Sequence, residues 1–149
     1  MVLDNGKIII FGLNGEHYAA DIREVERILG YEEPTVLPEA PSFVKGVINH
    51  EDKILPIISL SKKFNIGEGT DYEAKKIIVV KRKEKKFGII VDNVYEVRDM
   101  DGDVVENAPE ITNTTERKYI SGLIKLENKI VILLDLEKIL STEDEDNIF

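Results

Sequence analysis

The chain has 149 residues, of which 42% are hydrophobic and 33% charged, a formal net charge of -9 and no cysteine. This composition predicts one globular domain, and it excludes disulfides, thiol catalysis and thiolate metal sites. The negative charge argues against generic nucleic-acid binding, which needs a concentrated basic face. No apolar run approaches the roughly 20 residues of a membrane span, and the first residues lack the pattern of an export signal. We therefore expect a cytoplasmic protein without membrane insertion.

The first predicted element is a hairpin. Residues 7–13 and 16–22 have high β propensity and flank Asn14-Gly15, a dipeptide preferred in two-residue turns. A short helical turn is expected next, opening at residue 21 or 23 and ending before Gly30. Its apolar residues share one face at helical spacing: Ile22, Val25, Ile28 and Leu29.

The middle of the chain predicts an extended connection and a second hairpin. Three prolines in residues 31–42 exclude a central strand there. The second hairpin pairs residues 46–49 with residues 53–58, and a helical turn over residues 60–64 follows it. Residues 65–72, rich in glycine and acid, are the predicted boundary between two halves of the domain.

The last part of the chain repeats this order of elements. We expect a hairpin of residues 75–81 and 87–94, an irregular stretch over residues 99–117, and a closing hairpin of residues 119–126 and 129–135. Residues 142–149 are acidic and polar, and we expect them to be a frayed tail.

One segment occurs twice: residues 46–64 align without a gap with residues 122–140. The identical positions are turn formers and core aliphatics, such as Gly46 with Gly122 and Ile48 with Ile124, and no reactive side chain apart from paired acids and lysines recurs. The duplicated feature is therefore a scaffold, which favours a binding module over an enzyme. Short strands with glycine and proline turns indicate an all-β fold, and a duplicated five-stranded barrel fits their number.

The two halves, approximately residues 1–70 and 71–141, are each small for a core of their own, and strands can exchange between them. We therefore expect the halves to share a hydrophobic junction, with a groove there as a natural binding site.

Catalytic patterns are scarce. His17 and His50 carry no sequence sign of converging on a metal ion, and no phosphate loop, nucleophile elbow or helical zinc motif occurs. Acidic pairs such as Glu51-Asp52 lie in turn-like segments, where solvated carboxylates are the common explanation. We expect no catalytic residue, cofactor or metal ion. A small β-barrel enzyme or ligand carrier that uses the groove as a pocket is the alternative.

An ordered set of segments resembles the CheW-like domain of bacterial chemotaxis coupling proteins over residues 7–140. These segments are YAADI ending at Ile22, VERILGY (25–31), LPEAPSFVKGVIN (37–49), KILPIISL (53–60), FGIIVDNVYEV (87–97), YISGLIKL (119–126) and ILLDLEKIL (132–140). The resemblance implies two packed SH3-like five-stranded β-barrel subdomains with short helical turns and no catalysis.

The resemblance also implies partners. The family bridges the cytoplasmic tip of chemoreceptors (methyl-accepting chemotaxis proteins) and the regulatory domain of the histidine kinase CheA, so the protein would be recruited to membrane-associated receptor arrays. The length fits a standalone coupling protein. A CheW-like adaptor in a non-chemotaxis pathway is a second alternative. The implied receptor-binding residues are Val25, Arg27, Glu51, Ile77, Ile78, Gly88, Val94 and Val97, and the kinase-binding residues are Thr35, Val36, Leu37, Ala40, Pro41 and Phe43.

Two charged positions depart from the family pattern. Where the family usually reads asparagine, leucine, arginine and glycine, this chain has Asn49, His50, Glu51 and Asp52. The family usually has an acid at the position of Arg27. We hypothesise that Arg27 and Glu51 face each other near the groove and form the same ion pair with the partners exchanged.

Overall fold

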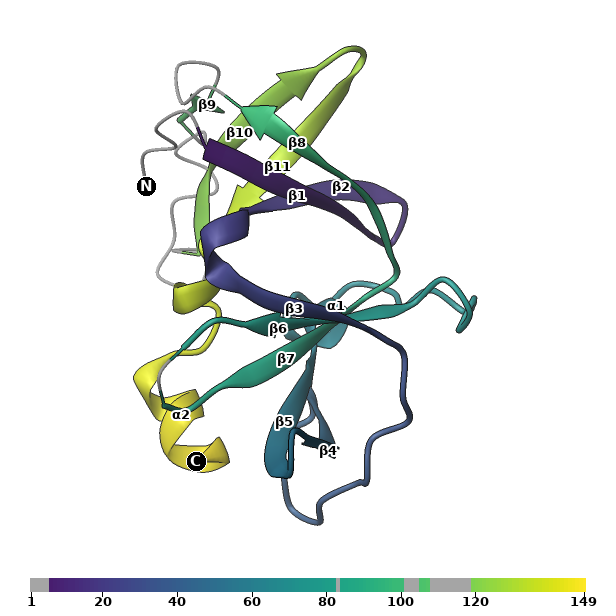
Figure 1. The fold of residues 1–149 in the computed structure, drawn as a ribbon, viewed down its shortest axis with the longest axis vertical. Helices are drawn as coiled ribbons and strands as arrows, with labels where there is room; N and C mark the ends of the chain where they lie inside the picture. Colours follow the sequence, from purple (N-terminus) through teal and green to yellow (C-terminus); the bar gives the residue numbers. More distant parts are fainter. Residues whose placement is uncertain (1–5, 83, 101–104, 108–118) are drawn as a thin grey trace.

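The computed structural model describes residues 6–82, 84–100, 105–107 and 119–149, and it contains two β-sheets stacked as layers (Figure 1). The first sheet has the strand order β8-β1-β2-β11-β10-β9: β8 (Asn93–Met100), β1 (Gly6–Leu13), β2 (Glu16–Asp21), β11 (Lys129–Leu134), β10 (Ile120–Leu126) and β9 (Val105–Glu106). The second has the order β3-β6-β7-β5-β4: β3 (Val25–Gly30), β6 (Lys76–Val80), β7 (Phe87–Val91), β5 (Lys53–Ser59) and β4 (Val44–His50). The strand content and the two packed subdomains agree with the predicted all-β class.

The predicted hairpins are present. In the first, Leu13 pairs with Glu16 across a turn in which Asn14 (φ 49°) and Gly15 (φ 80°) adopt positive φ, as a two-residue hairpin turn requires. The other hairpins are β4–β5, β6–β7 and β10–β11, and the turn after β5 is helix α1 (Leu60–Lys63). Most of the predicted irregular stretch 99–117 lies outside the described residues.

The predicted helical turn through Leu29 is wrong beyond Glu24. A 3-10 turn, η1 (Ile22–Glu24), is capped by the Asp21 side chain, and the chain then becomes strand β3. β3 pairs with β6, a strand about fifty residues later in the chain, from Val25 opposite Val80 to Gly30 opposite Lys76. Pairing with a distant strand therefore overrides the local helical spacing, which a short apolar segment does not distinguish from a strand.

The strand after each of two hairpins crosses to the other sheet. β3 follows the β1–β2 hairpin but joins the second sheet, and β8 follows the β6–β7 hairpin but joins the first. The predicted single strand over residues 87–94 is therefore two strands, interrupted at Asp92. Because of this exchange, the sheets do not follow the sequential halves 1–70 and 71–141.

The duplicated segment forms the same structure twice. β4–β5 and β10–β11 have β-bulges at matching positions, next to Gly46 and Gly122. A Cβ atom on Gly46, where φ is 143°, would lie 2.1 Å from the carbonyl oxygen of Thr35, and one on Gly122 would lie 2.7 Å from that of Glu106. Each repeated glycine therefore lets another backbone segment approach the hairpin edge closely.

The described residues form three hydrophobic cores: each sheet has one of its own, and the third lies between the sheets as the predicted shared junction. Successive residues of β1 alternate between cores: Ile8 and Ile10 belong to the first sheet's own core, whereas Ile9 and Phe11 belong to the junction. β6 alternates in the same way between the junction and the second sheet's core. The continuous apolar runs in these strands arise because both faces of each strand are buried.

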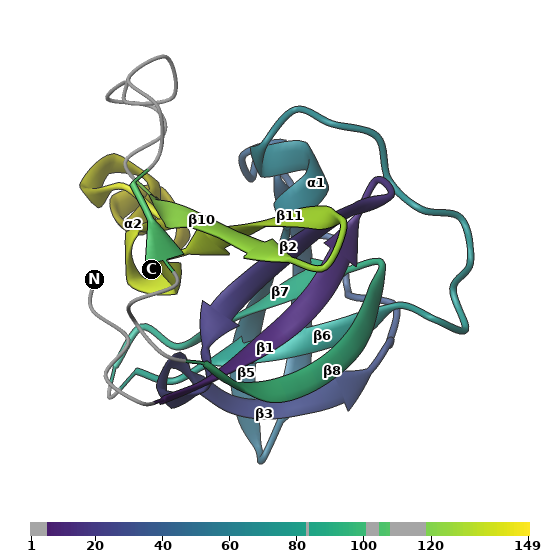
Figure 2. The same cartoon turned by 90° about the horizontal axis from the view of Figure 1, so that it is seen from above.

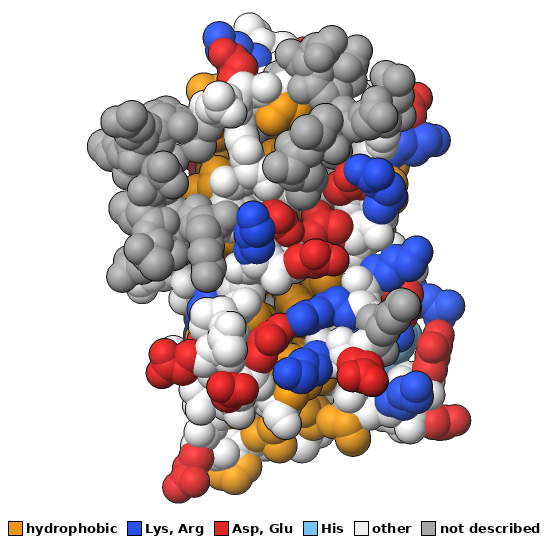
Figure 3. Space-filling model, turned by 90° about the vertical axis from the view of Figure 1, so that its left-hand side faces the viewer, with side chains coloured by type: hydrophobic (Ala, Val, Ile, Leu, Met, Phe, Trp, Pro, Cys, Tyr) orange, Lys and Arg blue, Asp and Glu red, His pale blue; other side chains and the backbone are white. Residues whose placement is uncertain are grey.

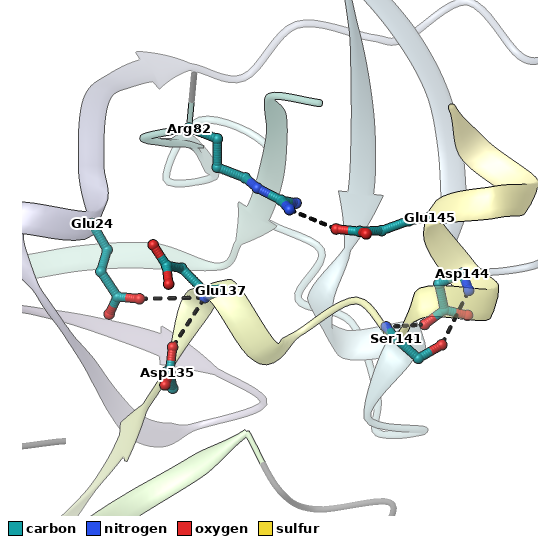
Figure 4. A network of polar contacts seen from close by, with 7 residues as sticks. All are labelled: Glu24, Arg82, Asp135, Glu137, Ser141, Asp144 and Glu145. Carbon is teal, nitrogen blue, oxygen red and sulfur yellow. Dashed lines mark hydrogen bonds and ion pairs between the residues drawn. The ribbon is translucent and has the colours of Figure 1, made fainter. Parts of the chain in front are cut away.

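The predicted frayed tail is instead a helix, α2 (Thr142–Ile148). Ser141 and Asp144 form a capping box, with the Ser141 hydroxyl accepting from the Asp144 backbone N–H and the Asp144 carboxylate accepting from the Ser141 backbone N–H (Figure 4). Lys63 of α1 donates to Asp144 and Arg82 to Glu145, each over 2.6 Å. These contacts hold the acidic helix against the rest of the protein, whereas its composition alone predicts a frayed tail. Another 3-10 turn, η5 (Leu136–Lys138), precedes the helix.

Candidate protein-interaction surfaces

Aliphatic side chains from the two crossing strands border the junction core. Val25 of β3 and Val94 of β8 both pack against this core. Val97 lies opposite Ile9, a junction residue, so it points to the same face, and 47% of it is exposed. Figure 2 shows β3 and β8 along the same side of the molecule. Val25, Val94 and Val97 thus face the same junction core from two edge strands, and their role in receptor binding stays a prediction.

The sequence analysis missed one member of this surface. Ile28 lies opposite Ile78 of the junction core and is 38% exposed. It was interpreted as part of a helical apolar face, whereas the alternation of a strand places it on the junction side.

Three residues of the predicted receptor-binding set lie inside the protein. Ile77 and Ile78 are fully buried, the first in the core of the second sheet and the second in the junction. Gly88 is buried between them and β5, since a Cβ on it would lie 2.8 Å from Ile77 Cγ2 and 3.0 Å from Ile57 Cδ1. Ile78 lies beneath the junction surface, whereas Ile77 and Gly88 face the core of the second sheet, and none of the three can contact a partner in this structure.

Arg27 and Glu51 form the hypothesised ion pair, with Arg27 Nη2 3.5 Å from Glu51 Oε1. Its location differs from the hypothesis. Arg27 lies opposite Val79, which belongs to the second sheet's own core, so Arg27 is on the other face of β3 from Ile28. The pair therefore lies at the rim of the second barrel, where the β4–β5 turn meets β3.

Other charged residues surround this pair. Lys86 Nζ lies 2.8 Å from Glu26 Oε1, and His50 Nε2 lies 3.9 Å from both Glu26 Oε2 and Glu51 Oε1. The hydrogen bond from Lys86 lowers the pKa of Glu26, against a smaller opposing effect of burial. The rim is thus a mixed-charge cluster in which both carboxylates face a cation.

The predicted kinase-binding segment connects β3 to β4. Thr35 is held against the sheet by two hydrogen bonds with the backbone of Val47, each 2.9 Å. Beside it, Val36 is 75% exposed and Leu37 is also exposed, while Ala40, Pro41 and Phe43 are half-buried. Lys63 Nζ lies 4.4 Å above the Phe43 ring. This segment is an ordered edge with protruding aliphatic side chains, far along the second sheet from β3 (Figure 1).

A carboxylate cluster that the sequence did not reveal joins η1 to η5. Glu24 Oε2 and Asp135 Oδ1 both accept from the backbone N–H of Glu137, at 3.3 and 3.1 Å (Figure 4). Burial, reinforced by the charge of Asp135, raises the pKa of Glu24 to about 8. Figure 3 views the molecule from the left-hand side of Figure 1. It shows acidic side chains gathered at the centre of that face, with basic side chains around them.

Two curved sheets that share a core and present exposed aliphatic side chains at separate edges define a protein-interaction module. The sequence profile of the CheW-like domain matches residues 7–144, and the chain therefore belongs to the CheW-like domain family. Among the described residues, no helix is long and apolar enough to cross a membrane.

Named relatives agree with this assignment. The chain is 36% identical to a chemotaxis protein CheW of Klebsiella aerogenes over 93% of this chain and 83% of that protein, and 28% identical to one of Bacillus subtilis over 95% and 90%. It is similar to the crystal structure of the scaffolding protein TtCheW from Thermoanaerobacter tengcongensis, with 32% identity, a TM-score of 0.84, and coverage of 95% of this chain and 92% of that one. The protein is thus a scaffolding adaptor of the chemotaxis type and not an enzyme.

Proposed function

We propose that the protein couples transmembrane chemoreceptors to the histidine kinase CheA by binding the cytoplasmic tip of the receptors and the regulatory domain of the kinase. The observation that carries the proposal is the pair of exposed aliphatic surfaces at separate places on one rigid body: Val97 with Ile28 at the junction, and Val36 with Leu37 on the β3–β4 connection. Receptor binding would hold the protein in membrane-associated arrays.

The junction surface suits a helical receptor hairpin. A helix presents apolar side chains three and four residues apart, and such side chains bind in a shallow apolar surface between two elements. Val25 and Val94 form the half-buried floor, and Ile28 and Val97 are exposed at its border. Val25 and Val94 pack against the buried junction core, so little conformational freedom of these side chains would be lost on binding, which favours affinity.

The β3–β4 connection suits the kinase. Its two hydrogen bonds to Val47 fix the backbone, so Val36 and Leu37 are presented in a defined geometry without a covering element among the described residues. The net charge of -9 adds attraction toward basic partner surfaces, and added salt weakens this attraction.

The deciding experiment is a calorimetric titration of the protein with the CheA regulatory domain of the same organism. We expect saturable one-to-one binding, and we expect Val36→Asp to weaken it because a charge would be buried at the contact. The control is Ile130→Asp, at another exposed aliphatic residue, in the first sheet, which should leave kinase binding unchanged. If the folded protein shows no binding, the kinase proposal is wrong, and a CheW-like adaptor of another signalling pathway takes its place.

A further inference from the structure

Three potential metal ligands meet at the rim of the second barrel. Glu26 lies at the β-bulge of β3, His50 ends β4, and Glu51 is the first turn residue after it, with a φ of 52°. One ligand atom from each, a ring nitrogen of His50 and a carboxylate oxygen of each glutamate, can be chosen so that all three lie within 4.8 Å of one another. Side chains from two elements thus point toward one position.

The imidazole of His50 is buried, but its Nε2 atom lacks a hydrogen-bond partner among the described residues. The side chain is only 9% exposed. Buried polar atoms are nearly always paired in folded proteins. One carboxylate oxygen of Glu26 and one of Glu51 each lie 3.9 Å from His50 Nε2. This distance is too long for a direct hydrogen bond, but it leaves room for an ion that contacts the nitrogen and both oxygens.

The duplication shows that the fold does not need a histidine here. His50 aligns with Leu126 of the second copy, and each residue ends a strand with the same burial pattern. Glu51 aligns with Glu127, so the turn itself is similar in both copies. An apolar side chain therefore satisfies the packing at this position, and the histidine adds a chemical group that packing does not require.

We infer that Glu26, His50 and Glu51 bind a divalent transition-metal ion of the zinc class. One imidazole nitrogen and two carboxylate oxygens suit zinc and its first-row neighbours, whereas magnesium and calcium favour oxygen ligands alone. Ligand atoms about 2.1 Å from a tetrahedral ion lie about 3.4 Å apart. The observed 3.9 Å distances therefore need only a small contraction, which the flexible glutamate side chains allow.

Two cations already contact the carboxylates and compete with the ion. Lys86 lies 2.8 Å from Glu26, and Arg27 lies 3.5 Å from Glu51. Binding would therefore draw Glu51 away from Arg27 and change the charge pattern of the rim. We expect this competition, and a set of three ligands instead of four, to make the site weaker than a structural zinc site.

The site opens to a cavity of about 410 Å³ between the β4–β5 turn, the β6–β7 turn and the end of α2. An ion held by three protein ligands keeps a coordination position for water or for a group from another molecule. The charged residues that line the cavity are Lys53, Lys85 and Lys86 with Glu51 and Glu84, and the bound ion would add further positive charge, so an anionic group is favoured at that position.

The test is a calorimetric titration of the tag-free protein with zinc chloride in a non-chelating buffer. We expect saturable binding of one ion, and a loss of affinity of more than about 10-fold in His50→Leu, since changes to outer-shell partners alone already reach that scale. The matched control is His17→Leu, the same substitution at the other histidine, which stacks on Tyr95 with ring centroids 4.4 Å apart. This control should bind zinc as the unmodified protein does.

A second variant tests the site without depending on correct folding of His50→Leu. Glu51→Gln changes an exposed ligand and should weaken zinc binding while lowering the unfolding temperature of the metal-free protein only slightly, because the exposed pair with Arg27 contributes little to stability. Zinc should also raise the unfolding temperature of the unmodified protein but not that of His50→Leu. The inference is overturned if zinc shows no saturable binding, if His17→Leu weakens binding as much as His50→Leu, or if Glu51→Gln binds zinc unchanged.

Discussion

Arg27 of β3 and Glu51 of the β4–β5 turn lie 3.5 Å apart, although β3 and β4 are at opposite edges of the same sheet. The pair therefore connects the two edges at one end of the second barrel. Both side chains are more than half exposed, so the contribution to stability is small and the main effect is to orient the turn.

Exchanging the two charges should preserve this connection. We expect Arg27→Glu and Glu51→Arg each to lower the free energy of unfolding by about 0.5 to 1 kcal/mol, and the double variant to recover most of the loss. Urea unfolding in the presence of a chelator measures all four proteins under one condition. Purely additive effects in the double variant would show that the two residues do not interact.

Replacing Val97 with aspartate should abolish binding of a receptor-tip hairpin. Val97 is exposed, so the change leaves the cores intact, whereas Val94→Asp would also place a charge against the junction core. Ile130→Asp is the control with similar exposure on another part of the surface. Co-sedimentation with receptor-containing membranes measures the effect, and undiminished binding of Val97→Asp would place the receptor elsewhere.

Gly46→Ala should be among the most destabilising single substitutions. The new Cβ would lie 2.1 Å from the backbone oxygen of Thr35 at a φ of 143°, so the Thr35 bridge or the bulge must move. We expect a loss of about 2 to 4 kcal/mol in the free energy of unfolding. Gly30→Ala, which meets no atom within 4 Å and has no positive φ, should change stability little. Equal losses in both variants would contradict this explanation.

Because the pKa of Glu24 is raised, we expect this residue to lower the free energy of unfolding as the pH rises from 5 to 8. Its folded pKa of about 8 exceeds the ordinary value of 4.5, so the folded state binds more protons than the unfolded state in this window, and unfolding is favoured as the pH increases. Glu24→Gln removes this penalty. We expect the variant's advantage to grow with pH, reaching about 1 to 3 kcal/mol at pH 8 after allowance for solvent screening.

The comparison that isolates Glu24 is the stability difference between each variant and the unmodified protein, measured by urea unfolding at several pH values. Asp21, Asp144 and Glu68 have lowered pKa values and change the total stability in the opposite sense, but they are common to all the proteins compared. Glu32→Gln, at an exposed carboxylate, is the control. An advantage of Glu24→Gln that does not vary with pH would refute the raised pKa.

Local signals in the sequence were enough for the hairpins. Asn14-Gly15 and the turns at the equivalent Glu51 and Glu127 specify tight reversals, because their conformations depend on a few neighbouring residues. The duplication likewise predicted two matching hairpins with a shared core. Of the predicted receptor-binding residues, Val25, Val94 and Val97 face the junction core from edge strands, whereas Ile77, Ile78 and Gly88 are buried.

The sequence by itself determined the hairpins, their turns, the repeated scaffold and the family, since these depend on short-range geometry and on ordered motifs. Only the tertiary structure decided that β3 and β8 exchange sheets, that Ile28 faces the junction, and that α2 is anchored by Lys63 and Arg82. Each of these depends on partners distant in the chain. The alternation of a short apolar segment fits a helix or a strand equally until a neighbouring strand supplies the hydrogen bonds.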